Sequence, residues 1–152
     1  DTGLDDLIGR LGARIGLEQI RRIAPGESHL PEKATQVRAA AWAAPAADWP
    51  AEPARMRPLV MFQPELVTPE EEAGTAPSAL PLAFRWRRRQ FATASATGPE
   101  RIAPEWWLDD PAWRSGQRDY WMVETGCGAR LWLYYAHGDA LSGGWFCHGE
   151  FA

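Results

Sequence analysis

Apolar side chains near the start of the chain recur at spacings of three and four residues. They are Leu4, Leu7, Ile8, Leu11 and Ile15. This spacing puts them on one face of a helix, and the carboxylates of Asp5 and Asp6 stabilise the positive N-terminal end of such a helix. The pattern therefore predicts an amphipathic helix over residues 4–15. Gly9 and Gly12 weaken its intrinsic stability, so we expect it to dock, either on the edge of the local core or on another protein.

A different pattern, with a period of two, begins at Leu82. From there to Arg87, large apolar side chains alternate with smaller or basic ones, as in a half-buried strand with a basic outer face. Three later segments have the composition of strands and are separated by glycine-containing turns; they are residues 119–124, 130–135 and 144–151. Short turns between consecutive strands favour an antiparallel meander. The predicted fold is mainly β (α+β): a small antiparallel sheet, either a meander or a partly open barrel, with an N-terminal amphipathic helix.

Alanine and proline dominate the middle of the chain. Eight of the 13 prolines fall between residues 45 and 81, and their fixed φ angles and missing N–H donors favour an extended connector. We therefore predict three parts: a helical arm with an ordered loop over residues 1–38, an Ala/Pro-rich connector over 39–80, and an antiparallel β domain over 81–152. One strand is expected within the connector, at residues 57–62, where the next proline ends it.

Tryptophans are unusually frequent and fall into two groups. Trp42 and Trp49 lie in the connector, where they either pin it to the domain surface or anchor another protein. Seven of the nine tryptophans lie after residue 81. We expect most of these in the core, because they supply much of the available apolar area. Trp106 and Trp107 are likewise expected to seal the core.

The composition limits the functions that the chain can have. A chain of 152 residues with 45% hydrophobic content can bury one main core. Its formal net charge of −4 provides no overall attraction to nucleic acid, so contact with DNA requires a local basic patch. Two cysteines are too few for a secreted disulfide framework, and no signal sequence or membrane-spanning apolar run is present. We predict a cytoplasmic protein without membrane association, and because the chain begins at Asp1 we expect a piece of a longer polypeptide.

Residue types that carry metal or acid–base chemistry are sparse. The soft-ligand candidates are Cys127, His137, Cys147 and His148, and their spacing lacks the close ligand pairs of structural zinc sites. Adjacent Cys147 and His148 would point to opposite faces of a strand. We expect both cysteines to be free thiols packed as small hydrophobes. No spacing matches a nucleophile, phosphate-loop or metalloprotease motif, so we predict that the chain is not an enzyme and assign no catalytic residue, metal or cofactor.

The most concentrated basic run in the chain consists of Arg85, Arg87, Arg88 and Arg89. Arginine and tryptophan are enriched both in hot spots of protein interfaces and in surfaces that bind single-stranded nucleic acid. The run therefore has three interpretations: a solvated strand face, a protein contact, or a contact with DNA phosphates.

Several motifs of the second half are specific enough to indicate a family. The run GPERIAPEWW at residues 98–107 is followed by RDYWMVE at 118–124, RLWLY at 130–134 and WFCHGEFA at 145–152. Residues 7–16, 27–32 and 84–88 fit the same pattern. Together these motifs resemble the C-terminal region of the ImuB family, and the resemblance runs through nearly the whole chain except the Ala/Pro-rich connector.

This resemblance implies a role in error-prone translesion synthesis after DNA damage, the SOS mutagenesis of bacteria. ImuB proteins are catalytically inactive homologues of Y-family DNA polymerases, and they connect the sliding clamp, the RecA-like accessory protein ImuA and the error-prone C-family polymerase ImuC. Because the family uses its C-terminal region for protein contacts, ImuA and ImuC are the expected partners. The clamp-binding motif is expected upstream of Asp1; residues 63–67 resemble a clamp peptide only superficially, because Pro64 interrupts them and no aromatic residue follows.

The resulting prediction is a non-catalytic protein-interaction module. Its candidate contact residues are Leu7, Leu11, Ile15, Trp42, Trp49, Arg85, Arg87, Arg88 and Arg89. The alternative prediction is an accessory surface for single-stranded or primed DNA, formed by a basic strand over residues 85–89. Salt-sensitive affinity for DNA distinguishes the alternative from the first prediction.

Overall fold

The computed structural model describes residues 2–44, 49, 57–70 and 75–151. The chain divides into two compact units, with the boundary between Arg55 and Met56. Of the predicted connector, residues 39–80, the structure describes 39–44, 49, 57–70 and 75–80, whereas residues 45–48, 50–56 and 71–74 lie outside the described residues. The first unit carries the N-terminal helix and the second carries a large sheet, so each of the two main sequence patterns belongs to its own unit.

The first unit begins with the predicted helix. α1 spans Thr2–Ile15 and is followed by a 3₁₀ turn, η1, at Leu17–Gln19. Two strands, β1 (Arg21–Pro25) and β2 (Thr35–Ala39), then form an antiparallel pair. The sequence pattern predicts a helical arm and an ordered loop over residues 1–38 and does not specify this pairing. Alternation does not reveal the pair, because four of the five residues of β2 are exposed and only one residue of β1 is buried.

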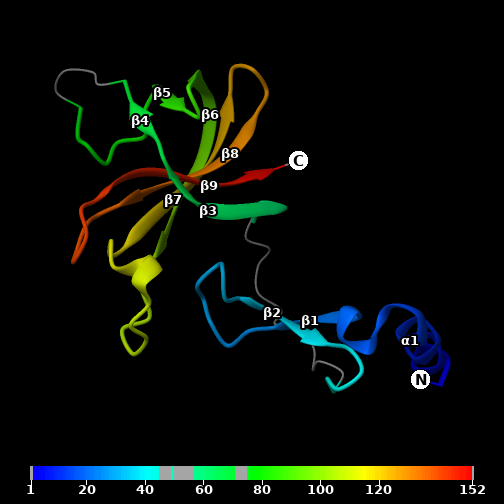
Figure 1. Ribbon diagram of the computed structural model, residues 1–152. Helices are drawn as coiled ribbons and strands as arrows, with labels where there is room; N and C mark the ends of the chain where they lie inside the picture. The colour runs from blue at the N-terminus through cyan, green and yellow to red at the C-terminus, as the bar shows by residue number, and fades with distance from the viewer. Residues whose placement is uncertain (1, 45–48, 50–56, 71–74, 152) are drawn as a thin grey trace. The chain divides into compact units, whose positions relative to one another are not determined.

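The second unit contains one antiparallel sheet of seven strands. They are β3 (Val60–Leu66), β4 (Thr68–Pro69), β5 (Ala83–Trp86), β6 (Arg89–Ile102), β7 (Arg118–Thr125), β8 (Arg130–Ala136) and β9 (Gly144–Phe151). Their order in space is β3-β9-β8-β7-β6-β5-β4, and the sheet curls into a half-barrel (Figure 1). The predicted mainly β fold, with an antiparallel sheet, a partly open barrel and an N-terminal helix, is confirmed.

The sheet also includes residues that the sequence pattern assigned to the connector. β3 pairs with β9, and β4 pairs with β5. The strand expected at residues 57–62 is therefore present, but it does not end before Pro64, because β3 continues through that residue. Proline lacks an N–H donor and is tolerated here because β3 is an edge strand whose register shifts between Met61 and Glu65.

The arginine run lies around a hairpin turn. β5 ends at Trp86 and β6 starts at Arg89, and the residues between them, Arg87 and Arg88, have φ angles of 47° and 64°. Positive φ at both central positions is the conformation of a type I′ hairpin turn, which usually takes Asn and Gly. The prediction of a basic strand over residues 85–89 is wrong, because Arg87 and Arg88 lie in this turn and in no strand.

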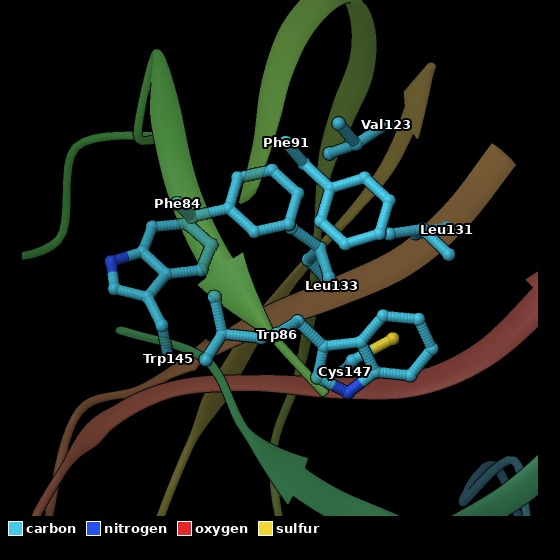
Figure 2. Close-up of a cluster of buried hydrophobic side chains, with 9 residues drawn as sticks. Phe84, Trp86, Phe91, Val123, Leu131, Leu133, Trp145 and Cys147 are labelled. Carbon is cyan, nitrogen blue, oxygen red and sulfur yellow. The ribbon is translucent and has the colours of Figure 1, made fainter. Parts of the chain in front are cut away.

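One face of the sheet covers the main hydrophobic core (Figure 2). Its buried members are Val67, Phe84, Trp86, Phe91, Val123, Leu131, Leu133, Trp145 and Cys147. They come from β5 to β9 and from the residue between β3 and β4. The rings of Phe84 and Phe91 stack with centroids 5.5 Å apart. Burial of one such side chain stabilises the fold by about 1.5–3 kcal/mol, so this cluster is the main source of stability in the second unit.

The opposite face of the central strands β7, β8 and β9 is also buried. It carries a stack of rings in which the centroids of Tyr120 and Trp132 are 4.1 Å apart and those of Trp132 and His148 are 5.5 Å apart. Cys147 belongs to the main core and His148 to this second stack, so the two neighbours point to opposite faces, as predicted. Residues outside the strands cover the stack, and the guanidinium of Arg57 lies 5.2 Å from the centre of the Trp132 ring.

Candidate functional site

The connection between β6 and β7, residues 103–117, carries Trp106, Trp107 and Trp113. It contains a short 3₁₀ turn, η2 (Pro111–Trp113). The carboxylate of Asp110 accepts a hydrogen bond from the N–H of Ala112 at 3.0 Å and so caps this turn. Trp113 is buried, which fixes the second half of the connection against the sheet.

Arg118, the first residue of β7, is buried beneath this connection and contacts it. Its guanidinium lies 3.8 Å from the centre of the Trp113 ring and 4.5 Å from that of Tyr134, and the residue is 1% exposed. It donates to the hydroxyl of Tyr120 at 3.1 Å and to the main-chain carbonyl of Ala112. Aromatic faces and hydrogen-bond acceptors stabilise a buried cation, and here they come from both the sheet and the connection. Arg118 therefore ties the two together.

A second loop, residues 137–143 between β8 and β9, supports the same connection. The N–H groups of His137, Gly138 and Leu141 donate to the carbonyls of Gln117, Ser115 and Arg114, each at 3.0 Å. Both loops lie at the same end of the sheet (Figure 1). Gly116 has a φ of 78°, and a Cβ atom there would lie 2.9 Å from the carbonyl oxygen of Gly138. The close approach of the two loops therefore requires glycine at this position.

The anchored connection presents its two adjacent tryptophans to solvent. Trp106 is 88% exposed and Trp107 is 63% exposed, and their rings meet edge to face with centroids 5.6 Å apart. Leu108 beside them is exposed as well, and we call residues 106–108 the tryptophan tip. This corrects the prediction that Trp106 and Trp107 seal the core. Trp113 does so instead, because it is the indole that meets Arg118.

Arg87, in the β5–β6 turn, is bonded within the sheet. Its Nε and Nη2 atoms donate to the two carboxylate oxygens of Glu65 at 2.7 and 2.8 Å, and its guanidinium lies 4.4 Å from the centre of the Trp86 ring. The hydrogen bonds with Arg87 hold the pKa of Glu65 below its ordinary value, and the same bonds raise the pKa of Arg87. Because Glu65 belongs to β3, the pair joins the turn to that strand, and residues 63–67 are not a free linear clamp peptide.

The other arginines of the run have different surroundings. Arg85 in β5 and Arg88 in the turn are exposed. The guanidinium of Arg89, at the start of β6, lies 5.2 Å from the centre of the Phe91 ring. All four arginines are exposed. They do not form one continuous basic strand face, because Arg87 and Arg88 lie in the turn and Arg87 is paired with Glu65.

The apolar stripe of α1, which we call the leucine stripe, is uncovered. Its members Leu4, Leu7, Leu11 and Ile15 are between 42% and 56% exposed. A Cβ atom at Gly12 would lie 2.2 Å from the Cδ2 atom of Leu17, so α1 packs on η1 through this glycine and not through the stripe. Trp42 and Trp49 are also exposed. The sequence predicts that the helix docks either on the local core or on another protein. In the described part of the chain, the leucine stripe is not buried against a core.

A polar cluster without any sequence motif lies at the start of β7. The carboxylate of Asp119 is almost fully buried and accepts hydrogen bonds from Nε and Nη2 of Arg101 at 2.6 and 2.8 Å. It also bonds to Nε2 of His137 at 2.7 Å. The bonds from Arg101, and after them the bond from His137, lower the pKa of Asp119. Sheet register, which places Arg101 opposite Asp119, brings these residues together, so no local spacing could reveal the cluster.

The two cysteines are free and occupy opposite environments. Cys147 lies in the core, and burial raises the pKa of its thiol to about 12. Cys127 is exposed in the β7–β8 turn, where a hydrogen bond with the hydroxyl of Thr125 is the main cause that lowers its pKa. The predicted packing as a small hydrophobe is confirmed for Cys147 and is wrong for Cys127.

His148 is neutral at physiological pH. Burial lowers its pKa to about 4, and its Nδ1 atom is hydrogen bonded to the hydroxyl of Tyr120 at 3.0 Å. Among the described residues, no group of three or more His, Cys, Asp or Glu side chains is arranged to hold a metal ion. The one α-helix in the described part of the chain, α1, is too short and too polar to cross a membrane.

The fold and these surfaces define a mainly β half-barrel domain, preceded by a smaller helical unit, with exposed apolar side chains on both. Over 160 aligned residues the chain is 36% identical to Protein ImuB of Caulobacter vibrioides, in strain NA1000/CB15N and in strain ATCC 19089/CB 15. The alignment covers 99% of this chain and 34% of each relative, so the chain spans about a third of their length. The chain is therefore an ImuB-like C-terminal region, as its motifs predicted.

No family model matches the chain, and no solved structure gives a significant match. The assignment accordingly rests on sequence similarity to these curated relatives.

Proposed function

We propose that this chain is a non-catalytic protein-interaction module of an error-prone translesion DNA synthesis complex, and that it docks ImuA, ImuC or both in the DNA damage response. Similarity to Protein ImuB supports membership of such a mutagenesis cassette. The proposed setting is the bacterial cytoplasm. Contact with the sliding clamp is proposed for the longer protein and not for residues 63–67, which form part of the sheet. The observation that carries the docking is the uncovered leucine stripe of α1.

An amphipathic helix gains most of its stability when its apolar face is buried. α1 contains Gly9 and Gly12, each of which costs about 1 kcal/mol relative to alanine in a helix interior. Its leucine stripe nevertheless stays about half exposed. A groove on a partner would bury the stripe and stabilise the helix at the same time, as in other helix-in-groove interfaces. The exposed indoles of Trp42 and Trp49 belong to the same unit and supply further aromatic anchors.

Binding of the purified chain to purified ImuA and ImuC, each measured separately by interferometry, tests this proposal. Leu11→Asp places a charge on the leucine stripe, and Ala13→Asp places the same charge on another face of α1. We expect Leu11→Asp to weaken binding about 10-fold or more and Ala13→Asp to change it less than about 2-fold, because central apolar anchors dominate interface energies. Circular dichroism checks that both variants keep the helix.

Two other results would count against the proposal in different ways. A wild-type chain that binds neither ImuA nor ImuC at micromolar concentration would refute the proposed function. Equal weakening by Leu11→Asp and Ala13→Asp, with helix content unchanged, would remove the leucine stripe as the contact while leaving the docking function in place.

The alternative function, binding of single-stranded or primed DNA near residues 85–89, has one observation in its favour. Arg85 and Arg88 are exposed and can reach phosphates. Against it, Arg87 is paired with Glu65 and its Nη1 atom lies 3.4 Å from a carboxylate oxygen of Glu150, so carboxylates compensate part of the charge. Salt-dependent affinity for a primed oligonucleotide that disappears in Arg85→Ser/Arg88→Ser would favour this alternative.

A further inference from the structure

The tryptophan tip is an apolar surface that the packing of its own domain leaves unused. Trp106, Trp107 and Leu108 are exposed, and so is Leu141 on the loop that supports the connection. Single exposed apolar side chains are common on protein surfaces, whereas a contiguous group of them marks a contact site. Two adjacent indoles are the strongest such signal, since tryptophan is the residue type most enriched in interface hot spots.

The backbone that carries the tip is already ordered. The N–H of Leu108 donates to the carbonyl of Glu105 at 2.8 Å, which closes a turn with the two indoles at its central positions. Glu105 is buried on one side of this turn, and Trp113 is buried on the other. Because these anchors fix the backbone before any partner arrives, binding through the tip loses little conformational entropy.

The charges around the tip are mainly negative. The supporting segments 103–117 and 137–143 contain three carboxylates that are not buried, Asp109, Asp110 and Asp139, against one guanidinium, Arg114. Arg114 is itself paired with Asp109, with 2.9 Å between Nη2 and Oδ2. Such surroundings repel nucleic acid phosphates and attract lysine and arginine side chains.

We infer that the tryptophan tip is a second contact surface of this chain, and that it inserts into an apolar pocket bordered by lysine or arginine side chains on a protein partner. The inference rests on the proposed function, because it assigns another surface through which the same module docks. The tip belongs to the second unit and the leucine stripe to the first, so the two surfaces can be tested by separate substitutions.

Titration of ImuA and of ImuC, each purified, against the purified chain tests the inference. The double variant Trp106→Ala/Trp107→Ala removes both indoles, and Leu82→Ala removes another exposed apolar side chain of the same unit. We expect the double variant to weaken binding of at least one of the two proteins about 10-fold or more and Leu82→Ala to leave it within about 2-fold. Thermal unfolding should be unchanged in both, because all three side chains are exposed.

A charge reversal tests the basic border of the pocket. Asp139→Lys changes the sign of an exposed charge on the 137–143 loop, which is hydrogen bonded to the connection that carries the tip. We expect it to weaken the same interaction by about 3-fold or more at low salt and by less at high salt. Unchanged affinity of Asp139→Lys at low salt would overturn the charge complementarity on which the choice of partner rests.

The remaining outcomes are distinct. If the wild-type chain binds ImuA or ImuC and Trp106→Ala/Trp107→Ala binds equally well, the inference is overturned and the proposed function stands. If the wild-type chain binds neither protein, the proposed function fails and the inference fails with it. If an oligothymidine strand binds and its binding depends on Trp106 and Trp107, the tip is a base-stacking surface and the inference of a protein pocket is overturned.

Discussion

The guanidinium of Arg118 lies 3.8 Å from the centre of the Trp113 ring, and both side chains are almost completely buried. Arg118 belongs to β7 and Trp113 to the connection that precedes it, so this contact joins the sheet to the base of the tryptophan tip. Burial of a cation is costly unless its N–H groups are bonded and its charge is accommodated. The side chain of Arg118 therefore contributes both to the stability of the sheet and to the position of the connection that carries the tip.

Replacement of Arg118 by methionine removes the guanidinium but keeps much of the apolar length. We expect the free energy of unfolding to fall by about 2–4 kcal/mol, because the carbonyl of Ala112 and the hydroxyl of Tyr120 lose a buried donor. Urea denaturation measures the change. At the exposed Arg88, the same substitution should alter stability by less than about 0.5 kcal/mol. If Arg118→Met is as stable as the wild type, the buried cation does not anchor the connection.

The stability of the domain should depend on pH through His148. Burial, and secondarily the charge of Arg118, lowers the pKa of His148 to about 4 in the folded state, whereas an imidazole in the unfolded chain has a pKa near 6.5. Between these values the unfolded state binds more protons than the folded state. The free energy of unfolding therefore falls as pH decreases from about 6.5 to about 4, by roughly 3 kcal/mol in total.

Urea unfolding at several pH values between about 7.5 and about 4, a range that includes both pKa values of His148, measures this slope. His148→Phe removes the titrating group and keeps an aromatic ring beside Trp132, so its stability should change much less over the same range. The lowered pKa of Asp119 also stabilises the folded state. This contribution to the free energy of unfolding is lost only at more acidic pH, below the ordinary pKa of a carboxyl group. If the free energy of unfolding of His148→Phe falls just as steeply with decreasing pH, the pH dependence is due to other groups.

Features with a regular period were predictable from the sequence, and features set by tertiary contacts were not. Alternation around Phe84 and Trp86 predicted a strand with these side chains inward, and both are buried in β5. The connection after β6 has no period, so nothing local shows that Trp113 is buried while Trp106 is exposed. That difference arises because Arg118, on the next strand, stacks on only one of these indoles.

The arginine turn shows how tertiary contacts override local preference. Two arginines at positive φ contradict the preference of type I′ turns for Asn and Gly, so the sequence pattern favours a continuous strand. The bidentate bond from Arg87 to Glu65 and the contact of its guanidinium with Trp86 hold the turn in this conformation. Glu65 lies in β3, within a segment whose prolines favoured a connector, so its pairing with Arg87 had no local signal.

The two cysteines should differ sharply in reactivity. Cys127 is exposed and its pKa is lowered, whereas Cys147 is buried and its pKa is raised to about 12. Because the thiolate is the reactive form, iodoacetamide at neutral pH should alkylate Cys127 in the folded protein and reach Cys147 only after unfolding. Peptide mass spectrometry reads out both sites. Alkylation of Cys147 in a native Cys127→Ser variant would contradict its place in the core.

Opposite effects are expected from glycine at the two central positions of the β5–β6 turn. Left-handed backbone costs a non-glycine residue about 1–2 kcal/mol, and glycine removes this cost, although its greater freedom in the unfolded chain offsets part of the gain. At Arg88, whose side chain is exposed, we expect Arg88→Gly to stabilise the protein by about 0.5 kcal/mol.

Arg87→Gly relieves the same backbone strain but removes the bonds to Glu65 and the contact with Trp86, which join the turn to β3. We therefore expect Arg87→Gly to lower the melting temperature while Arg88→Gly raises it, in differential scanning calorimetry at one pH and ionic strength. Because the bond to Glu65 is partly solvent-exposed, the loss in Arg87→Gly should shrink as salt concentration rises. If both substitutions raised the melting temperature equally, the contacts of Arg87 would add nothing to stability, and the turn would owe its shape to the flanking strands.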